Sequence, residues 1–115
     1  MLSIICQRTN DFISQMPKTL RKEYGQFFTS VETARFMASL FDLADLKKSV
    51  SILDAGAGSG ILAISIAERI LQHDSSMKVE IVCYENDPHV LPLLKSNLEL
   101  VKKEYKIIFL QVVEK

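Results

Sequence analysis

Residues 52–60 read Ile52-Leu53-Asp54-Ala55-Gly56-Ala57-Gly58-Ser59-Gly60, and the apolar run of residues 61–67 follows directly. This succession predicts a buried strand, a glycine-rich turn and a helix. Three of the four glycines of the chain lie in the turn, where the missing Cβ atoms allow positive φ and a close approach of backbone to a ligand. The first N–H groups of the helix point toward whatever lies over the turn. The stretch therefore predicts a site for a nucleotide-like ligand.

Composition and charge place the chain among globular proteins. Its 115 residues allow one domain or a part of one, and 48% of them are hydrophobic and 24% charged. The 14 basic and 14 acidic residues cancel, so the overall charge does not indicate a nucleic-acid binder, although a binding surface elsewhere in a larger enzyme stays open. Cys6 and Cys83 form no disulfide framework. The lack of a membrane-length apolar run and of a secretory signal pattern favours a cytoplasmic protein without a membrane partner.

The N-terminal part, residues 1–45, predicts two helices. Apolar residues spaced as one helical face occupy residues 1–16, and Pro17 limits this helix. Residues 18–25 are polar and basic and are assigned no element. Thr29 or Ser30 caps the second helix, whose apolar stripe continues to about residue 44.

Residues 46–115 predict a βαβαβ core. The expected elements are strands over 50–53, 78–84 and 107–113, a helix over 60–72, and a helix from Pro88, capped by Asp87, to about residue 103. Strands that alternate with helices of this length are parallel and joined by right-handed crossovers, which gives an α/β fold with strand order 3-2-1. The near-continuous apolar strands predict a sheet covered on both faces.

The glycine turn satisfies a dinucleotide-binding fingerprint, because Gly58-Ser59-Gly60-Ile61-Leu62-Ala63 matches G-x-G-x-x-A. Asp54, however, stands at the end of the strand before it, and a carboxylate there would repel a pyrophosphate. The same carboxylate suits a ligand that carries positive charge. A nicotinamide-binding oxidoreductase domain is therefore disfavoured but remains an alternative.

The pattern Asp-x-Gly-x-Gly-x-Gly at the end of a first strand resembles the S-adenosylmethionine site of class I methyltransferases. The resemblance implies a Rossmann-like fold and a cofactor that carries an ammonium, a sulfonium and no phosphate. It implies that Gly56, Gly58 and Gly60 approach this cofactor and that Asp54 organises the loop and contacts the amino-acid end, often through water. The alternative for Asp54 is a carboxylate that caps the loop and touches no ligand.

Glu85 stands at the end of the second predicted strand, where a βαβ unit places the acid that holds a ribose diol through two hydrogen bonds. The alternative is an exposed strand-end acid. Asn86 follows at the position that, by the resemblance, lies against the adenine, where these enzymes often have an apolar residue. Asp87 is the rival acid, but its place before Pro88 makes it a better helix cap.

The segment Tyr24-Gly25-Gln26-Phe27-Phe28-Thr29 resembles the Gly-Gln-Phe-(Tyr/Phe)-Thr-Pro motif of N6-adenine DNA methyltransferases of restriction–modification systems. The resemblance implies that Thr29 holds the methionine carboxylate and that Phe27 and Phe28 wall the cofactor pocket. Ser30 replaces the usual proline, which makes the turn less rigid. The alternative is a pair of core phenylalanines followed by a helix-capping threonine.

Such enzymes also carry Asn/Asp-Pro-Pro-Tyr/Phe after a fourth strand, where it holds the flipped target adenine. The three prolines of this chain include no Pro-Pro pair, so no catalytic residue is assigned, and the histidines have no partners at metal-ligand spacing. We therefore expect the cofactor-binding N-terminal part of a larger DNA methyltransferase, inactive alone, with DNA bound through its missing C-terminal part. The strand order leaves the first strand at an exposed edge, so the isolated chain is expected to self-associate.

Two further functional classes remain open. One is a class I methyltransferase that acts on RNA, protein or a small molecule. The other is a non-catalytic Rossmann-like interaction module that kept the fold and lost the ligand.

Overall fold

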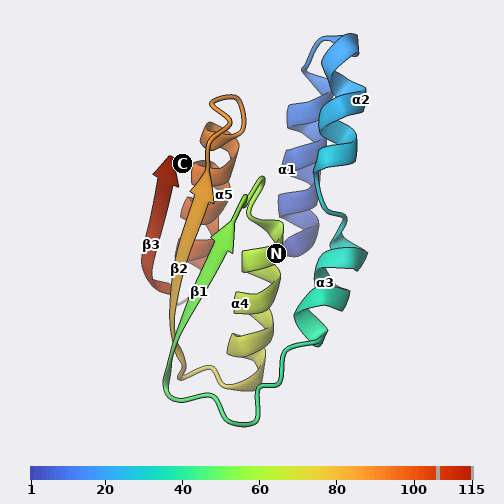
Figure 1. Cartoon of the computed structure of the whole chain (residues 1–115). Coiled ribbons are helices and arrows are strands. Elements are labelled where there is room, and N and C mark those ends of the chain that lie inside the picture. Colours follow the sequence, from blue (N-terminus) through green and yellow to red (C-terminus); the bar gives the residue numbers. More distant parts are fainter. Residues whose placement is uncertain (106, 115) are drawn as a thin grey trace.

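The computed structural model describes residues 1–105 and 107–114, with the backbone alone at residues 26, 27 and 107–110. Its sheet consists of β1 (Ser49–Ala55), β2 (Lys78–Glu85) and β3 (Ile107–Glu114), all parallel, in the order β1-β2-β3 (Figure 1). Counted from the other edge, this is the predicted order 3-2-1. The α/β fold with parallel strands is thus confirmed, and the carboxyl ends of the strands meet at one edge of the sheet.

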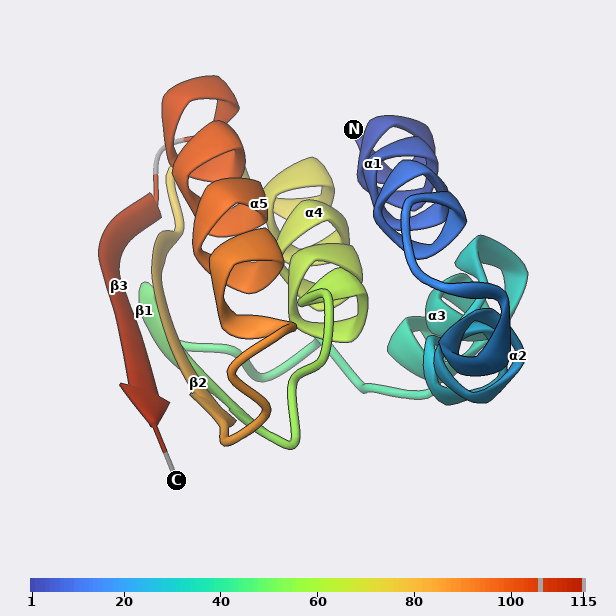
Figure 2. The ribbon, with the colours of Figure 1, turned by 90° about the horizontal axis from the view of Figure 1, so that it is seen from above.

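Two helices connect the strands, and both lie on the same face of the sheet. They are α4 (Ile61–His73) and α5 (Leu91–Glu104), and Figure 2 shows them side by side on that face. Two right-handed crossovers that step in the same direction place their helices on one face. The expectation of a sheet covered on both faces is wrong for the described residues, since Leu53 of β1 is 68% exposed. A later reversal of strand order would be needed to place helices on the other face.

The N-terminal part contains three helices instead of two: α1 (Leu2–Ser14), α2 (Lys18–Phe27) and α3 (Val31–Ser39). Figure 2 shows them beyond α4 and α5, on the side away from the sheet. The missed helix, α2, has no broad apolar stripe and is built from Lys, Leu, Arg and Glu, which all favour helix. Helix α1 ends at Ser14, with Gln15 as its C-cap, and Pro17 follows two residues later at the N-cap position of α2.

The ends of α3 are held by hydrogen bonds. Of the two predicted caps, Ser30 is the one used, and its Oγ accepts a 3.2 Å hydrogen bond from the N–H of Thr33. The helix ends at Ser39, before the predicted residue 44, and Arg69 of α4 donates from Nη1 to the carbonyls of Ala38 and Phe41, at 2.8 and 2.5 Å. A cation at the carboxyl end of a helix interacts favourably with the helix dipole.

The start of α5 differs from the prediction. Asp87 caps a separate turn, in which its Oδ1 accepts a 2.8 Å hydrogen bond from the N–H of His89. The helix begins at Leu91, so Pro92 instead of Pro88 occupies its first turn. Both prolines satisfy the rule that proline belongs where N–H groups have no intrahelical partner.

The core lies between the sheet and the two helices that cover it. Its fully buried side chains include Val79 and Ile81 of β2, Ile64 of α4, and Leu94 and Leu98 of α5. On the outer side, α1 adds Leu2 and Ile5. No helix in the part of the chain that the structure describes is both long and apolar enough to cross a membrane.

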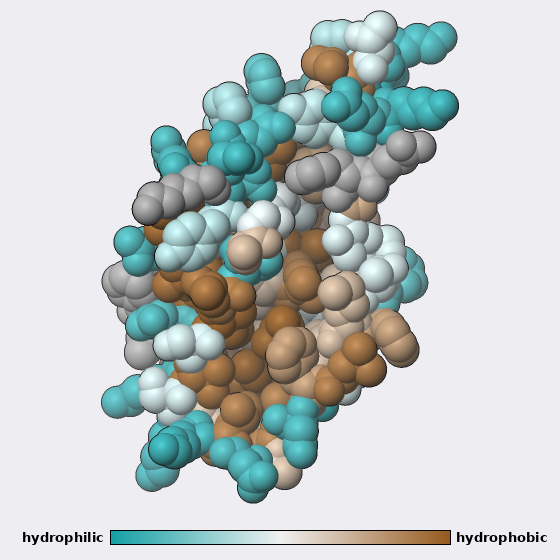
Figure 3. Space-filling view, in the orientation of Figure 1, coloured by the Kyte–Doolittle hydropathy of each residue, from teal (hydrophilic) through white to brown (hydrophobic). Residues whose placement is uncertain are grey.

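The edge of the sheet at β1 is unpaired within the described residues, because β1 pairs with β2 alone. A groove of about 200 Å³ follows this edge, between α4 and the connection that precedes β1, and most of its lining is apolar. Figure 3 shows apolar surface gathered in this region. A free strand edge beside an apolar groove is a template for pairing with another chain.

We expect the isolated chain to self-associate through this edge, because a net charge of zero supplies no long-range repulsion between copies. Light scattering over a range of concentrations should show mass increasing with concentration. The variant Leu53→Lys should weaken association about tenfold or more, because two copies would bring like charges together. Ile4→Lys, at another exposed apolar position on α1, should have no such effect. A constant monomer mass at high concentration would contradict this prediction.

Candidate functional site

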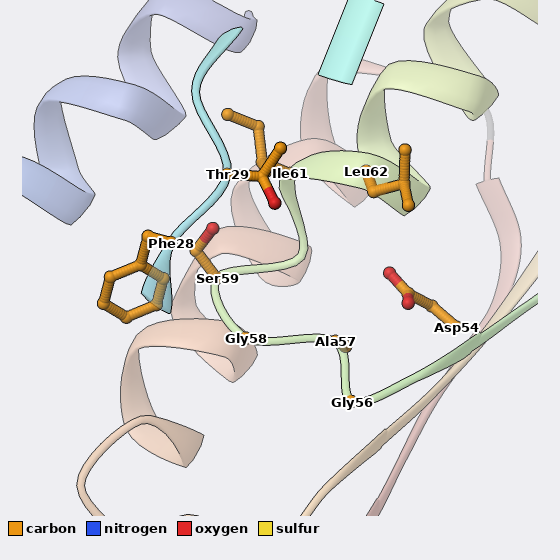
Figure 4. Close-up of a pocket in the computed structure, with 9 residues that line it drawn as sticks. All are labelled: Phe28, Thr29, Asp54, Gly56, Ala57, Gly58, Ser59, Ile61 and Leu62. Atoms are coloured by element: carbon orange, nitrogen blue, oxygen red, sulfur yellow. The ribbon is translucent and has the colours of Figure 1, made fainter. Parts of the chain in front are cut away.

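A cavity of about 200 Å³ opens at the carboxyl end of β1. Figure 4 shows its three walls: the glycine turn, Asp54 at the end of β1, and the connection between α2 and α3, which carries Phe28 and Thr29. Its lining residues are Phe28, Thr29, Asp54, Gly56, Ala57, Gly58, Ser59, Ile61 and Leu62. Segments far apart in the sequence therefore meet at the place where the turn predicted a ligand.

The glycine turn has the backbone conformation that its composition predicts. Gly56, Gly58 and Gly60 all have positive φ, at 72°, 58° and 84°. The N–H groups of Gly56 and Ala57 both donate to the carbonyl of Tyr84, at 2.8 and 2.9 Å, which fastens the start of the turn to the end of β2. Residues other than glycine adopt this backbone conformation only at a cost in free energy.

Glu85 lies beneath the turn and binds backbone. It is 3% exposed, and its Oε1 accepts a 2.8 Å hydrogen bond from the N–H of Gly58. Its Oε2 accepts from the N–H groups of Asn86 and Asp87, at 3.1 and 3.0 Å. The carboxylate thus joins the glycine turn to the loop after β2. One acceptor position remains on Oε1, because a carboxylate oxygen accepts two hydrogen bonds.

The start of α4 presents unused backbone donors. In the described part of the chain, the N–H groups of Ser59, Ile61 and Leu62 make no hydrogen bond, and Gly60, the N-cap, has no side chain to bind them. All three residues line the cavity. The amino end of a helix carries partial positive charge, so these N–H groups form a place for an anionic group.

Asp54, at the end of β1, supplies the opposite charge beside the start of α4. Burial raises the pKa of its carboxyl above the ordinary 3.8, the backbone of Ala63 opposes this shift by hydrogen bonding, and the charge of Glu85 adds to it. Its Oδ2 is buried and has no hydrogen-bond partner among the described residues. A buried acceptor of this kind is costly unless a donor meets it, so Asp54 suits a ligand that carries N–H donors or positive charge.

The third wall is held by aromatic contacts and one long-range hydrogen bond. The ring of Phe28 packs edge-on against Phe12 of α1, with centroids 6.3 Å apart. The hydroxyl of Tyr24 donates a 2.7 Å hydrogen bond to Oδ2 of Asp87, and this bond, followed by burial, raises the pKa of Tyr24. The contact joins α2 to the loop after Glu85.

The structure brings together most of the residues that the sequence singled out. Phe28, Thr29, Asp54, Gly56 and Gly58 line the cavity, and Glu85 contacts its turn from below. Of the other three predicted residues, Gly60 faces α5 and Asn86 is exposed in the loop after β2, while the side chain of Phe27 lies outside the described residues.

Ala57, Ser59, Ile61 and Leu62 also line the cavity and were not predicted. Their positions within and directly after the glycine turn were the available signal. Tyr24 was quoted in the predicted motif without a role, and no local pattern indicates its partner 63 residues away. The described residues contain no cluster of three or more His, Cys, Asp or Glu side chains suited to a metal ion.

Comparisons with known proteins identify a family. Residues 9–112 match the family model described as N-6 DNA Methylase. The chain is 34% identical over 87 residues to the Type II methyltransferase M.BsuBI of Bacillus subtilis, an alignment that covers 76% of this chain and 17% of that protein. It is 29% identical over 80 residues to ribosomal RNA small subunit methyltransferase A of two strains of Streptococcus equi subsp. zooepidemicus. That alignment covers 70% of this chain and 24% of each relative.

The chain therefore spans less than a quarter of the length of these relatives. Within that span, the match includes the glycine turn, both acids beside it and the Phe28–Thr29 wall. The chain belongs to the N-6 DNA methylase family.

Proposed function

We propose that this chain binds S-adenosylmethionine, as the cofactor-binding part of a DNA adenine-N6 methyltransferase. One observation carries the proposal: the cavity is lined both by an acid with an unpartnered buried oxygen and by residues at the start of α4 whose N–H groups are unused. The amino-acid end of S-adenosylmethionine is a zwitterion and needs both kinds of partner. A pyrophosphate needs only the second and would be repelled by Asp54.

The proposal assigns each residue a contact. Asp54 receives the ammonium, and Thr29 with the N–H groups at the start of α4 receives the carboxylate. Glu85 holds the ribose, Asn86 lies at the adenine, Gly56 and Gly58 allow the close approach, and Phe28 walls the site. A cavity of about 200 Å³ is below the ~300 Å³ of a typical small-molecule site, so the rest of the cofactor extends toward the loop at Asn86.

The bound cofactor supplies a methyl group on an activated sulfonium, for direct displacement by the N6 amine of adenine. The residues of this chain bind and orient that cofactor, and none of them is assigned to the adenine. We expect the chain alone to bind without transferring, and DNA to be bound by a segment outside it.

Isothermal titration calorimetry tests the cofactor assignment. S-adenosylhomocysteine should bind detectably and NAD should not. Asp54→Asn should weaken S-adenosylhomocysteine about tenfold or more, because a charge-assisted hydrogen bond is lost. Affinity for 5′-methylthioadenosine, which lacks the amino-acid end, should stay unchanged. Binding of NAD without S-adenosylhomocysteine would overturn the proposal.

The stability of Asp54→Asn is a control, because this variant is expected to lose affinity for the ligand without losing stability. An acid whose folded pKa is raised contributes stability below its unfolded pKa, and this contribution is lost as pH rises through the folded value. The pKa of Asp54 is raised above 3.8, so its ionised form costs stability at neutral pH. Urea unfolding at pH 7 should therefore show Asp54→Asn at least as stable as the natural chain. A large loss of stability would mean that Asp54 is mainly a structural cap.

A methyltransferase that acts on RNA is the second candidate, favoured by the similarity to the ribosomal RNA methyltransferases. The same cofactor site would serve it. Methyl transfer from radiolabelled cofactor by the protein that contains this chain distinguishes the two. Incorporation into duplex DNA supports the leading proposal, and incorporation into small-subunit ribosomal RNA supports this one.

A further inference from the structure

Asn97 of α5 is a fully buried polar side chain outside the cavity lining. It is 0% exposed, and its Nδ2 donates a 2.9 Å hydrogen bond to the backbone oxygen of Ser59 in the glycine turn. Its Oδ1 is buried and has no hydrogen-bond partner in the described part of the molecule. The amide oxygen of Asn97 is therefore removed from water without a compensating hydrogen bond. This lowers the contribution of Asn97 to the stability of the fold.

The neighbours of Asn97 show that apolar side chains fit this surface. Leu94 and Leu98 lie on the same face of α5 and pack against Gly60, because a Cβ built there would lie 2.9 Å from Leu94 Cδ1 and 3.8 Å from Leu98 Cδ2. The polar residue stands between two leucines, at the point where the helix meets a carbonyl of the turn. The amide N–H of Asn97 donates to that carbonyl.

The hydrogen bonds of the turn show what this contact achieves. Before Ser59, the N–H of Gly58 donates to Glu85, and after the N–H of Ser59, the carbonyl of the same residue accepts from Asn97. The N–H of Gly60 donates to the carbonyl of Ala57 at 2.9 Å. The backbone around Ser59 is thus anchored before and after its own N–H, which makes no hydrogen bond among the described residues and lies in the wall of the cavity.

We propose that Asn97 is a positioning residue for the cofactor. By holding the carbonyl of Ser59, it fixes the peptide plane between Ser59 and Gly60, which connects the N–H of Ser59 to the N–H groups at the start of α4. These neighbouring N–H groups are thereby oriented toward the ligand carboxylate. Pre-organised donors bind more tightly because less ordering is required on binding. This inference rests on the proposed function and adds a residue that does not itself touch the ligand.

The test replaces Asn97 and measures binding and local order separately. Asn97→Leu removes the donor and also the unpartnered oxygen, so its urea midpoint should stay close to that of the natural chain. Its dissociation constant for S-adenosylhomocysteine should rise about tenfold or more. In the ligand-free protein, hydrogen exchange at the amide of Gly60, which donates to the carbonyl of Ala57, should become about tenfold faster. Asn97→Ser, too short to reach the carbonyl, should show the same loss of affinity and the same faster exchange, with a lower urea midpoint because it leaves a cavity.

Val101→Ala is the matched control, because Val101 is fully buried on the same helix but lies one turn beyond Asn97. It should lower the urea midpoint and leave both the affinity and hydrogen exchange at Gly60 unchanged. Unaltered affinity in folded Asn97→Leu would overturn the inference, and so would unfolding of both Asn97 variants, which would make the contact a requirement of the fold. If the natural chain fails to bind S-adenosylhomocysteine, the proposed function fails, while the exchange rates still report whether Asn97 orders the turn.

Discussion

Replacing Glu85 with alanine is expected to abolish binding of S-adenosylhomocysteine and to lower the free energy of unfolding by about 2–4 kcal/mol. The carboxylate is almost fully buried and accepts hydrogen bonds from three backbone N–H groups, those of Gly58, Asn86 and Asp87. Its removal leaves these donors unpaired and disconnects the glycine turn from the loop after β2. In the proposed function it also removes the ribose contact.

Calorimetry and urea unfolding measure the two effects of this change. Glu85→Gln should lie between the natural chain and Glu85→Ala, because an amide keeps one acceptor oxygen and turns the other into a donor that faces backbone N–H groups. Glu80→Gln is the control on the same strand, since Glu80 accepts its hydrogen bond from the hydroxyl of Ser51 and not from the turn. It should change stability and binding little. Retention of S-adenosylhomocysteine affinity in folded Glu85→Ala would refute the assigned role.

Gly60→Ala should lower the free energy of unfolding by about 2–4 kcal/mol, because two costs combine. The residue has φ of 84°, where a Cβ is strained. The same Cβ would lie 2.9 Å from Leu94 Cδ1, so α5 must shift or Leu94 must change rotamer. Urea unfolding measures the loss. The turn would also move away from its position at the cavity, and affinity for S-adenosylhomocysteine should fall with stability.

Two other glycines separate these costs. Gly56 has φ of 72° and no atom within 4 Å of an added Cβ, so Gly56→Ala should show the backbone strain alone, about 1–2 kcal/mol. Gly25 lies inside α2 with open space around it, and Gly25→Ala should stabilise by about 0.5–1 kcal/mol, because alanine favours helix. Equal losses in Gly60→Ala and Gly56→Ala would show that the contact with Leu94 contributes nothing.

Local patterns predicted the strands, the turn and the helix after it because their causes are local. Alternating glycines allow positive φ regardless of what surrounds them, and the geometry of Pro17 prevents the first helix from continuing past it. Helix α2 was not predicted because its polar sequence lacks the apolar stripe that is typical of a helix packed on a core. The start of α5 was misplaced because both Pro88 and Pro92 fit a first turn, and the hydrogen bond from His89 to Asp87 makes the first of them part of a separate turn.

The sequence by itself determined that residues 52–60 form a glycine-rich turn between a parallel strand and a helix. The prediction of a methyl-donor cofactor came from Asp54, Glu85 and the segment before Thr29. Only the tertiary structure decided that Glu85 binds the backbone of the turn, that Tyr24 reaches Asp87, and that Asn97 holds Ser59. Those contacts join residues 63, 27 and 38 positions apart. They depend on how the strands register and how α2 and α5 pack, which no local pattern encodes.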